Sequence, residues 1–287
     1  MKIIRSLTAM TAWSDRLRRE SVTIGFVPTM GALHDGHRSL IRAARLQCDA
    51  LVVSIFVNPT QFGPTEDFAR YPRSPKMDRA LCLSEGVDAC FEPSSVAMYP
   101  KGFQTLVTVP AMARRWEGES RPDHFPGVTT VVTKLFGIVR PHLALFGQKD
   151  FQQATLVQRL VQDLNMGVKI VVCPTIREQD GLAMSSRNVY LKTEERAVAG
   201  ALYKSLLAGA DAIRRGTTDA SVILASMSAI IRREPAFTID YLAVCDTLTL
   251  EPISLVTSKA VLLGAGRLGS IRLIDNLVVT APAKRKR

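Results

Sequence analysis

Short apolar runs alternate with amphipathic helical segments through the first part of this sequence, and this alternation constrains the fold more than any other feature. The runs predicted to form buried strands span residues 22–27, 50–57, 87–91, 142–146 and 168–173. The helical segments predicted among them span residues 33–47, 75–86, 127–140 and 151–165. Strands that are apolar throughout and alternate with helices form parallel sheets covered on both faces, with right-handed crossovers. We therefore predict an α/β fold with a Rossmann-like, doubly wound parallel sheet.

The pattern changes after about residue 180. Residues 193–214 and 217–233 are predicted to form long helices, and residues 238–244, 260–263 and 270–274 to form short, half-exposed strands. Helices followed by such strands indicate a smaller C-terminal α+β domain. A length of 287 residues suits two domains. We place the boundary within residues 175–188, with the Rossmann-like domain at 1–176 and the α+β domain at 177–287.

The composition excludes several classes of protein. Apolar residues make up 47% of the chain and charged residues 22%, which is typical of a folded globular protein and not of a disordered one. The sequence has no apolar run long enough for a transmembrane helix, no signal-peptide pattern and no internal repeat. Its five cysteines include no C-x-x-C pair and three lie in apolar runs, so we expect reduced, buried thiols and a cytoplasmic location.

The net charge of +11 leaves three kinds of partner open. Residues 284–287 supply four of these positive charges, and we expect this tail to be a frayed end. A charge of this size suits nucleic acid, an anionic membrane surface or a negatively charged small ligand. Aromatic residues make up only 6% of the chain and no nucleic-acid-binding motif occurs, which argues against the first of these.

The first candidate site follows the first predicted strand, which we expect to stop at Pro28. Its sequence is Pro-Thr-Met-Gly-Ala-Leu-His-Asp-Gly-His, and it holds two of the four histidines of the chain. His34 and His37 are three residues apart, so they share a face of the first helical turn. A helix N-terminus favours an anion, and Gly31 and Gly36 let phosphate oxygens approach the backbone. The segment is predicted to bind a triphosphate, with two surface histidines as the alternative; zinc is disfavoured because no third ligand lies nearby.

The second candidate site follows the strand predicted at residues 50–57. Asn58 and Gln61 carry uncharged donors and acceptors, which suit the hydroxyl groups and carboxylate of a polar substrate. An ordinary turn built on Asn58 and Pro59 is the alternative.

Two further polar segments also follow predicted strands. Lys149 would direct its ammonium group toward a phosphate near a helix start, with Gln153 one turn further on. The alternative there is a solvated Lys-Asp cap. Ser185, Ser186 and Arg187 provide hydroxyl, backbone and guanidinium donors for phosphate oxygens, with an interdomain linker as the alternative. Neither serine lies in the G-x-S-x-G pattern of a nucleophile elbow.

One glycine motif is dismissed as a nucleotide site. Residues 264–269 fit G-x-G-x-x-G, but the residues that follow alternate like a strand and leave no room for a βαβ unit. We expect a turn between strands there. The phosphate-binding pattern G-x-x-x-x-G-K-[ST] does not occur.

In this order and spacing, the candidate sites resemble those of the pantoate–β-alanine ligase (pantothenate synthetase) family, over nearly the whole chain. The matching segments are residues 28–37, 56–62, 66–67, 71–73, 120–122, 124–125, 127–128, 146–153, 184–188 and 272–276. A lone H-x-G-H would indicate only the nucleotidyltransferase superfamily, whereas the combination is specific.

The resemblance implies an ATP-dependent ligation in two steps, with Mg²⁺ accompanying the ATP. Pantoate would attack the α-phosphorus of ATP to give pantoyl adenylate and pyrophosphate, and the amine of β-alanine would then release pantothenate and AMP. The resemblance also implies a cytoplasmic homodimer, without nucleic acid or membrane partners, whose C-terminal domain acts as a lid over the nucleotide.

The resemblance implies a role for each matching residue. His37, His34 and Lys149 would be the catalytic residues that stabilise phosphate charge. The ATP-binding residues would be Met30, Gly31, Ala32, Leu33, His34, Asp35, Gly36, His37, Gly147, Gln148, Lys149, Asp150, Ile176, Met184, Ser185, Ser186 and Arg187. The substrate-binding residues would be Gln61, Gln153, Asn58 and Pro28, with Gln61 reaching both pantoate and β-alanine. No resident metal is expected.

The sequence departs from the family pattern at a few positions beside the expected contacts. The family frequently has Gly, Arg, Asn and Asp where this chain has Asp123, Pro126, Gly137 and His142. These differences bear on the detailed conformation of the loop at 117–125 and not on the reaction.

Two other functions are considered as hypotheses: another adenylyltransferase of the superfamily and a nucleic-acid-binding protein. Pyrophosphate exchange with several carboxylates tests the former, and a salt-dependent gel shift tests the latter.

Overall fold

The computed structural model describes residues 1–64 and 66–282, which form two compact units. Unit 1 consists of Met1–Gln148 and Gln152–Pro174, and unit 2 of Lys149–Phe151 and the chain from Thr175 onward. The basic tail at 284–287, expected to be frayed, lies outside the described residues.

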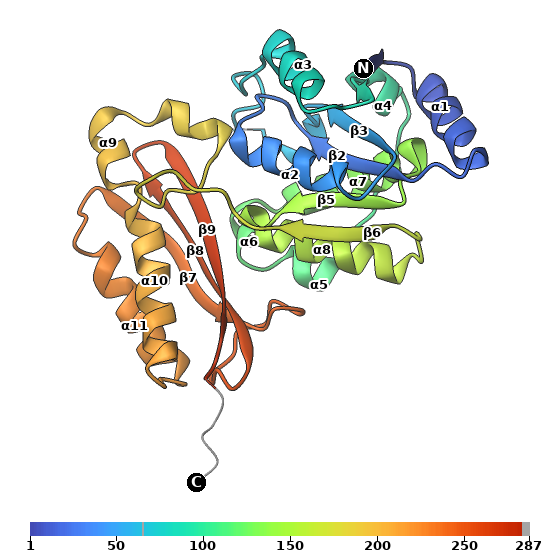
Figure 1. The fold of residues 1–287 in the computed structure, drawn as a ribbon. Helices are drawn as coiled ribbons and strands as arrows, with labels where there is room; N and C mark the ends of the chain where they lie inside the picture. The colour runs from blue at the N-terminus through green and yellow to red at the C-terminus, as the bar shows by residue number, and fades with distance from the viewer. Residues whose placement is uncertain (65, 283–287) are drawn as a thin grey trace. The chain divides into compact units, whose positions relative to one another are not determined.

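A six-stranded parallel sheet forms the centre of unit 1. Its strands are β1 (Lys2–Ile4), β2 (Ile24–Thr29), β3 (Ala50–Ile55), β4 (Ala89–Phe91), β5 (Leu143–Gly147) and β6 (Lys169–Cys173). Their order across the sheet is β1-β4-β3-β2-β5-β6 (Figure 1). The chain runs from β2 through β3 to β4 on one side and from β5 to β6 on the other, so the direction of winding reverses between β2 and β5. The predicted doubly wound α/β fold is therefore confirmed.

Helices cover both faces of this sheet. The helices of unit 1 are α1 (Leu7–Arg19), α2 (Asp35–Arg45), α3 (Pro75–Ser84), α4 (Ser95–Met98), α5 (Pro110–Ala113), α6 (Glu117–Ser120), α7 (His124–Val139) and α8 (Phe151–Asp163, from its second residue onward), with the 3-10 turn η1 (Pro59–Gln61). The 3-10 turn η2 (Gln148–Asp150) divides between the two units. Met10 of α1, Val132 of α7 and Val157 of α8 share one buried core. Ile41 of α2 and Cys82 of α3 belong to a second core. Each crossover thus buries its apolar stripe against the sheet, which is the driving force for this layered arrangement.

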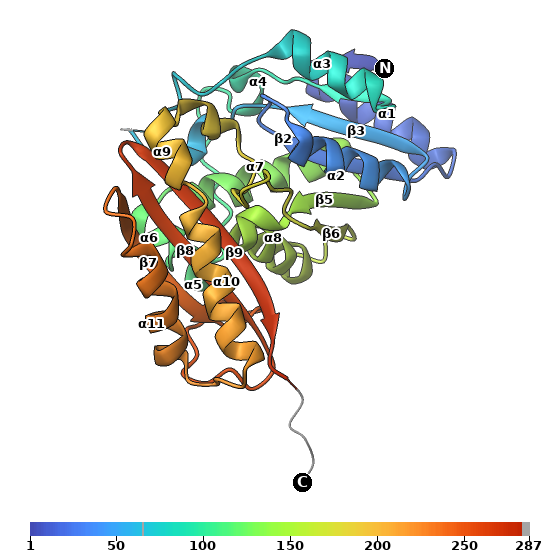
Figure 2. The same ribbon diagram turned by 60° about the vertical axis from the view of Figure 1, so that its left-hand side comes forward.

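Unit 2 pairs a three-stranded antiparallel sheet with helices. It contains η3 (Ser186–Tyr190), α9 (Thr193–Val198), α10 (Ala201–Arg214), α11 (Ala220–Ile231), β7 (Phe237–Cys245), β8 (Lys259–Leu268) and β9 (Ile271–Thr280). The strand order is β7-β8-β9, and α10 and α11 lie along one face (Figure 2). Leu206, Met227 and Leu262 are fully buried between helices and sheet. The predicted smaller α+β part is confirmed as a fold.

The strand predicted to stop at Pro28 continues through it to Thr29, so that boundary was wrong. Pro28 pairs in register with Ser54 of β3, whereas the pairing of β2 with β5 involves only Gly25 and Phe26. Proline is tolerated in a strand where one edge has no ladder partner.

The helical stretch predicted at 193–214 is present, but it forms two helices, α9 and α10, with a break at Ala199 and Gly200. A Cβ on Gly200 would lie 2.9 Å from the carbonyl oxygen of Asp180, so the chain passes close to another backbone segment there. Apolar periodicity did not reveal this interruption, since both helices continue the same pattern.

The strands predicted at 260–263 and 270–274 are longer than expected, and β8 is mostly buried. Gly264 and Gly266 lie inside β8, so the turn predicted for the glycine motif is correct only for Gly269. A Cβ on Gly264 would lie 2.8 Å from the Leu202 side chain of α10. These glycines therefore let neighbouring side chains pack closely against the sheet. The motif is followed by a strand and not by a helix, which agrees with the prediction that it does not bind a nucleotide.

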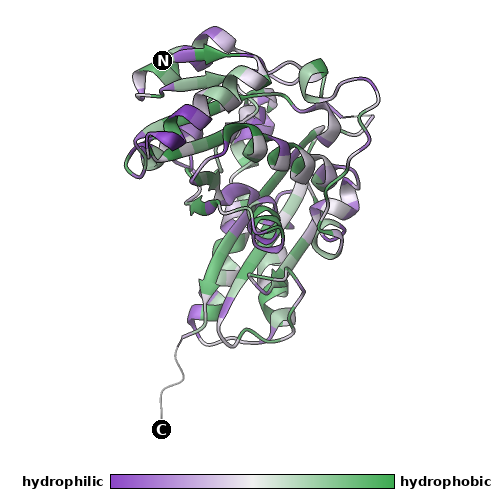
Figure 3. Cartoon of the chain, turned by 90° about the vertical axis from the view of Figure 1, so that its right-hand side faces the viewer, coloured by the Kyte–Doolittle hydropathy of each residue, from purple (hydrophilic) through white to green (hydrophobic). Residues whose placement is uncertain are grey.

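The first two elements, β1 and α1, were not predicted. β1 pairs with β4 at the edge of the sheet, and α1 begins at Ser6, whose Oγ accepts a hydrogen bond from the Ala9 amide. Serine before an amphipathic segment is the signal that would have located this helix. Figure 3 shows hydrophobic residues concentrated on the strands of both units. Among the described residues, no helix is both long and apolar enough to cross a membrane.

Candidate active site

The carboxyl ends of β2 and β5 are the place where a ligand is expected, because the direction of winding reverses between these strands. The segment that carries His34 and His37 follows β2 directly. Gly147 is the last residue of β5 and pairs with Cys173 of β6. The sheet therefore starts two of the predicted motifs at neighbouring strand ends of unit 1.

The rings of the two histidines accept hydrogen bonds from backbone amides at the N-terminus of α2. His34 is the N-cap residue, and its Nδ1 accepts a hydrogen bond from the Gly36 amide at 3.1 Å. The Nδ1 of His37 accepts one from the His34 amide at 3.3 Å, and the ring centroids lie 4.2 Å apart. Because each Nδ1 acts as an acceptor, each neutral ring carries its hydrogen on Nε2. The pair thus presents two Nε2–H groups at a helix N-terminus, which suits an anionic ligand.

The loop before His34 is held by a residue that sequence reasoning missed. The buried carboxylate of Asp78, on α3, accepts hydrogen bonds from the Ala32 amide at 3.0 Å and the Leu33 amide at 2.8 Å. Gly31 and Ala32 both have positive φ, and a Cβ on Gly31 would lie 3.0 Å from an Asp78 oxygen. The chain therefore forms a tight loop around this carboxylate, and the loop positions the histidine pair that follows it.

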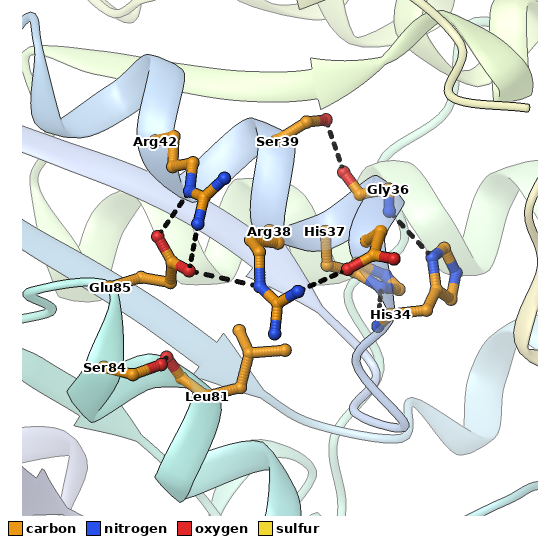
Figure 4. A network of polar contacts seen from close by, with 10 residues as sticks. His34, Gly36, His37, Arg38, Ser39, Arg42, Leu81, Ser84 and Glu85 are labelled. Carbon is orange, nitrogen blue, oxygen red and sulfur yellow. Dashed lines mark hydrogen bonds and ion pairs between the residues drawn. The ribbon is translucent and has the colours of Figure 1, made fainter.

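A charged network joins the same helix to α3 (Figure 4). Glu85 accepts hydrogen bonds from Arg42 at 2.7 and 2.9 Å and pairs with Arg38 at 3.1 Å. Arg38 also contacts Asp35 in the first turn of α2. The hydrogen bond from Arg42 lowers the pKa of Glu85, so this carboxylate stays ionised and anchors the helix that begins at the histidines.

The amides of the second motif lie inside unit 1. Asn58 is buried: its Nδ2 donates to Gln61 Oε1 and to the Gly127 carbonyl, both at 3.2 Å, and its Oδ1 accepts from Tyr99 at 2.8 Å. Gln61 Nε2 lies 3.0 Å from the sulfur of Met30. The structure thus brings the first and second motifs together through Met30 and Gln61, with Asn58 orienting the Gln61 amide.

Three side chains around Gln61 were missed as functional candidates. Arg121 forms an ion pair with Glu66 at 2.6 Å and donates to the Gln61 carbonyl at 3.3 Å. The Nδ1 of His124 lies 3.0 Å from the same carbonyl, which can only accept, so this ring donates from Nδ1. Burial, assisted by the Arg121 charge, lowers the pKa of His124 to about 4. His124 is therefore a neutral support of the Gln61 backbone, and the only sequence signal for it was its place in the matched segments.

The predicted phosphate-binding segment around Lys149, within residues 146–153, divides between the two units. Gln148 belongs to unit 1 and Lys149 and Asp150 to unit 2, and the Lys149 ammonium lies 3.7 Å from the Asp150 carboxylate. Gln153, on α8, is half-buried, whereas its neighbour Gln152 is buried and bonds to backbone groups near α5 and α6. Of the two adjacent glutamines, Gln153 is the one with an exposed part.

The predicted phosphate-binding segment with Ser185, Ser186 and Arg187 follows a hairpin in unit 2. The Met184 amide donates to the Ile176 carbonyl at 3.0 Å, and Gly181 turns the chain with φ of +93°. Ser185 is the N-cap of η3, and its Oγ accepts from the Arg187 amide at 3.2 Å. The Met184–Arg187 loop therefore starts a short helical turn.

No group of three or more histidine, cysteine, aspartate or glutamate side chains that could hold a metal occurs among residues 1–64 and 66–282. Within unit 1, the two histidine rings lie at the start of α2, and the side chains of Met30 and Gln61 bring the amides of Asn58 and Gln61 to the same segment.

Comparison with known proteins agrees with this chemistry. A model of the family described as pantoate-beta-alanine ligase matches residues 2–278. A pantothenate synthetase of Thermotoga petrophila is 50% identical over 279 residues, which are 97% of this chain and 100% of that protein. The solved pantothenate synthetase of Thermus thermophilus has a TM-score of 0.92 and 46% identity, over 96% of this chain and 99% of the other. A pantoate-beta-alanine ligase from Francisella tularensis, complexed with beta-gamma ATP and beta-alanine, has a TM-score of 0.79 and 34% identity over 97% of each chain.

Proposed function

The chain belongs to the pantoate–β-alanine ligase family, and from that premise we propose which of its residues perform the ATP-dependent joining of pantoate to β-alanine. The family membership confirms the resemblance found in the motifs. The enzyme forms pantothenate, a precursor of coenzyme A, through pantoyl adenylate, and releases pyrophosphate and AMP. The roles below are assigned residue by residue.

The first step needs stabilisation of phosphate charge. A pantoate carboxylate oxygen bonds to the α-phosphorus of ATP, and the bond from that phosphorus to the bridging oxygen of pyrophosphate breaks. Such substitutions leave little covalent work for the protein, so donors aimed at the developing charge carry the rate. The Nε2–H groups of His34 and His37 and the Lys149 ammonium are these donors in our proposal. Residues 30–36, 147–150, Ile176 and 184–187 complete the ATP site.

The second step needs an oriented acyl group and amine. The β-alanine nitrogen bonds to the activated carbonyl carbon, the bond to the AMP oxygen breaks, and the amine loses a proton. Gln61 holds pantoate and reaches β-alanine, with Gln153 as the second pantoate amide. Pro28, one residue before the end of β2, is a further substrate-binding residue in the proposal. Asn58 was expected to touch substrate; because its amide already bonds Gln61, Gly127 and Tyr99, we propose that it acts by orienting Gln61.

Magnesium enters with the substrate in this proposal. Mg²⁺ is usually bound through substrate phosphates and one or two carboxylates, with several waters retained, so MgATP is the form that binds. We further propose that the protein is a cytoplasmic homodimer. In this proposal the C-terminal unit acts as a lid, because an acyl adenylate is sensitive to water and must be shielded from it.

The observation that carries the proposal is the histidine pair, with both Nδ1 atoms bonded to the start of α2, beside a buried amide pair at the strand ends of one sheet. The experiment is a three-substrate assay with purified protein. We expect pyrophosphate release with pantoate and MgATP, and AMP formation only when β-alanine is added. Absence of AMP with all three substrates would overturn the proposal.

Two further experiments separate the alternatives. Pyrophosphate exchange that is faster with another carboxylate than with pantoate would identify a different adenylyltransferase. A salt-dependent gel shift that survives removal of the last four residues would favour nucleic-acid binding.

A further inference from the structure

A buried polar network in unit 2 contacts two segments that the proposed function places at the ATP phosphates. These are the hairpin before the Met184–Arg187 loop and the backbone of Lys149. The central member of the network is Arg177, at the base of the hairpin that leads into the Met184–Arg187 loop. The Arg177 guanidinium donates to both carboxylate oxygens of Asp275, at 2.5 and 2.9 Å. The side chains are only 16% and 4% exposed, so this is a buried ion pair. Loss of either partner would leave the other charge buried without compensation.

The same guanidinium also fixes the shape of the hairpin. It donates to the carbonyl of Gly181, at the hairpin tip, at 3.0 Å. Its Cζ lies 3.7 Å above the centroid of the Tyr203 ring of α10, which is a cation–π contact. Arg177 therefore connects the tip of the hairpin to α10 and to β9. The Met184 amide is in turn bonded to the Ile176 carbonyl, so the position of the hairpin determines where the following loop starts.

The next residue of β9 reaches the other phosphate-binding segment. Asn276 is 2% exposed, and its Nδ2 donates to the backbone carbonyl of Lys149 at 2.9 Å. Successive side chains of a strand point to opposite faces. Asp275 pairs with Gly264, where a Cβ would lie against Leu202 of α10, so Asp275 is on the face that α10 covers and Asn276 is on the opposite face. One strand thus holds the hairpin with one face and the Lys149 backbone with the other.

We propose that Asp275 and Asn276 are positioning residues for the ligation reaction, which hold Lys149 and the Met184–Arg187 loop in the arrangement that binds the ATP phosphates. The proposal rests on the function proposed above, in which Lys149 and Arg187 face phosphate. It assigns a purpose to two polar residues in a strand whose other buried residues, Leu273 and Val279, are apolar. Asp275 acts through Arg177 on the hairpin, and Asn276 acts on the Lys149 backbone. Neither residue needs to touch substrate.

The test is the isosteric variant Asn276→Asp, which replaces the donor to the Lys149 carbonyl with an acceptor. A misplacement of a catalytic group by about 1 Å costs roughly 10²-fold in rate, so we expect the pyrophosphate-exchange rate to fall about 10- to 100-fold. The KM for β-alanine should stay unchanged, because the second step does not use this contact. Asn276→Ser, whose side chain is too short to reach Lys149, should behave alike without adding a charge.

A matched control separates positioning from loss of stability. Ser205 is also fully buried in unit 2 and donates to the Met227 carbonyl at 2.9 Å, a contact that lies outside the phosphate-binding segments. Ser205→Ala should lower the unfolding temperature without changing the exchange rate. A rate loss in Ser205→Ala as large as that in the Asn276 variants would overturn the positioning role.

A double variant shows whether Asn276 acts through Lys149. If it does, Asn276→Asp in the Lys149→Ala background should slow exchange no further than Lys149→Ala alone, because coupled residues are non-additive. Fully additive losses would overturn the inference. Wild-type exchange in Asn276→Asp while Lys149→Ala is slow would also overturn it, whereas a wild-type rate in Lys149→Ala itself would instead refute the proposed function of that lysine.

Discussion

At the scale of single residues, the structure shows which ring nitrogens of the histidine pair can donate to a ligand. The spacing of His34 and His37 predicts a shared helix face, but it does not say which ring atoms are used. In the structure both Nδ1 atoms accept backbone hydrogen bonds at the start of α2, so both Nε2 atoms carry hydrogens. The pair is therefore set as neutral donors, which supports charge stabilisation more than proton transfer.

Removal of the proposed phosphate donors should slow turnover strongly. A preorganised donor to transition-state charge is typically worth about 3–4 kcal/mol, so His37→Ala and Lys149→Ala should each lower kcat roughly 10²-fold or more. Steady-state AMP formation with all three substrates measures this. Lys169, an exposed lysine at the amino end of β6, is the control, and Lys169→Ala should keep the wild-type rate. Wild-type turnover in His37→Ala or Lys149→Ala would refute the role of that residue.

His124 should make the folded protein sensitive to acid. Burial lowers its pKa from 6.5 to about 4, so between these values the unfolded chain binds a proton that the folded chain does not. The contribution of His124 to stability is complete above pH 6.5 and is lost as the pH falls toward 4. Urea unfolding between pH 7 and pH 4.5 should therefore show a smaller pH dependence in His124→Asn, whose amide can still donate to Gln61.

The pH experiment has an internal comparison. Burial also lowers the pKa of His142, whose Nδ1 accepts from the Ile24 amide, so His124→Asn should remove only part of the dependence. An unchanged pH slope in His124→Asn would show that this histidine does not stay neutral in the folded protein.

At the scale of elements, the position of Gln61 depends on how closely α7 packs against η1. A Cβ on Gly127 of α7 would lie 2.2 Å from the Thr60 carbonyl oxygen and 2.7 Å from the Gln61 Cα. The helix therefore lies against the backbone of η1, and the Gly127 carbonyl also accepts from Asn58. A glycine at this position is a packing requirement that also positions Gln61, the amide proposed to bind pantoate.

Gly127→Ala should disturb both folding and pantoate binding. Overpacking of this kind costs about 1–3 kcal/mol, and relief of the clash must move η1 and with it Gln61. We expect a lower free energy of unfolding and a higher KM for pantoate, measured by urea unfolding and by pyrophosphate exchange. A Cβ on Gly137, in the same helix, would meet no atom of the described residues within 4 Å. Gly137→Ala should stabilise the protein by up to about 1 kcal/mol with unchanged KM; equal effects of the two substitutions would contradict this account.

At the scale of the whole molecule, the net charge of +11 combines separate contributions. Lys149 and Arg187 have phosphate-facing roles in the proposed function, and other arginines pair with carboxylates, as Arg177 does with Asp275. The four charges at residues 284–287 lie outside every matched motif. The basic balance therefore gives no support of its own to a nucleic-acid partner.

Deletion of residues 284–287 should leave catalysis intact. The deletion lowers the net charge from +11 to +7, since all four residues are Lys or Arg. We expect unchanged kcat and KM for all three substrates, and earlier elution from a cation-exchange column. A fall in kcat on deletion would show that the tail contributes to the reaction.

The sequence by itself determined the doubly wound sheet apart from β1, the helices α2, α3, α7 and α8 on it, and the family, because these follow from local periodicity and from motifs of contiguous residues. It did not reveal that Asp78 holds the Ala32 and Leu33 amides, that Asn58 is used in orienting Gln61, or that Asn276 bonds to Lys149. Each of these contacts joins segments that only tertiary packing brings together, and periodicity carries no information about such partners. The short break between α9 and α10 was missed for the same reason, since close backbone approach at Gly200 and not local apolar pattern decides it.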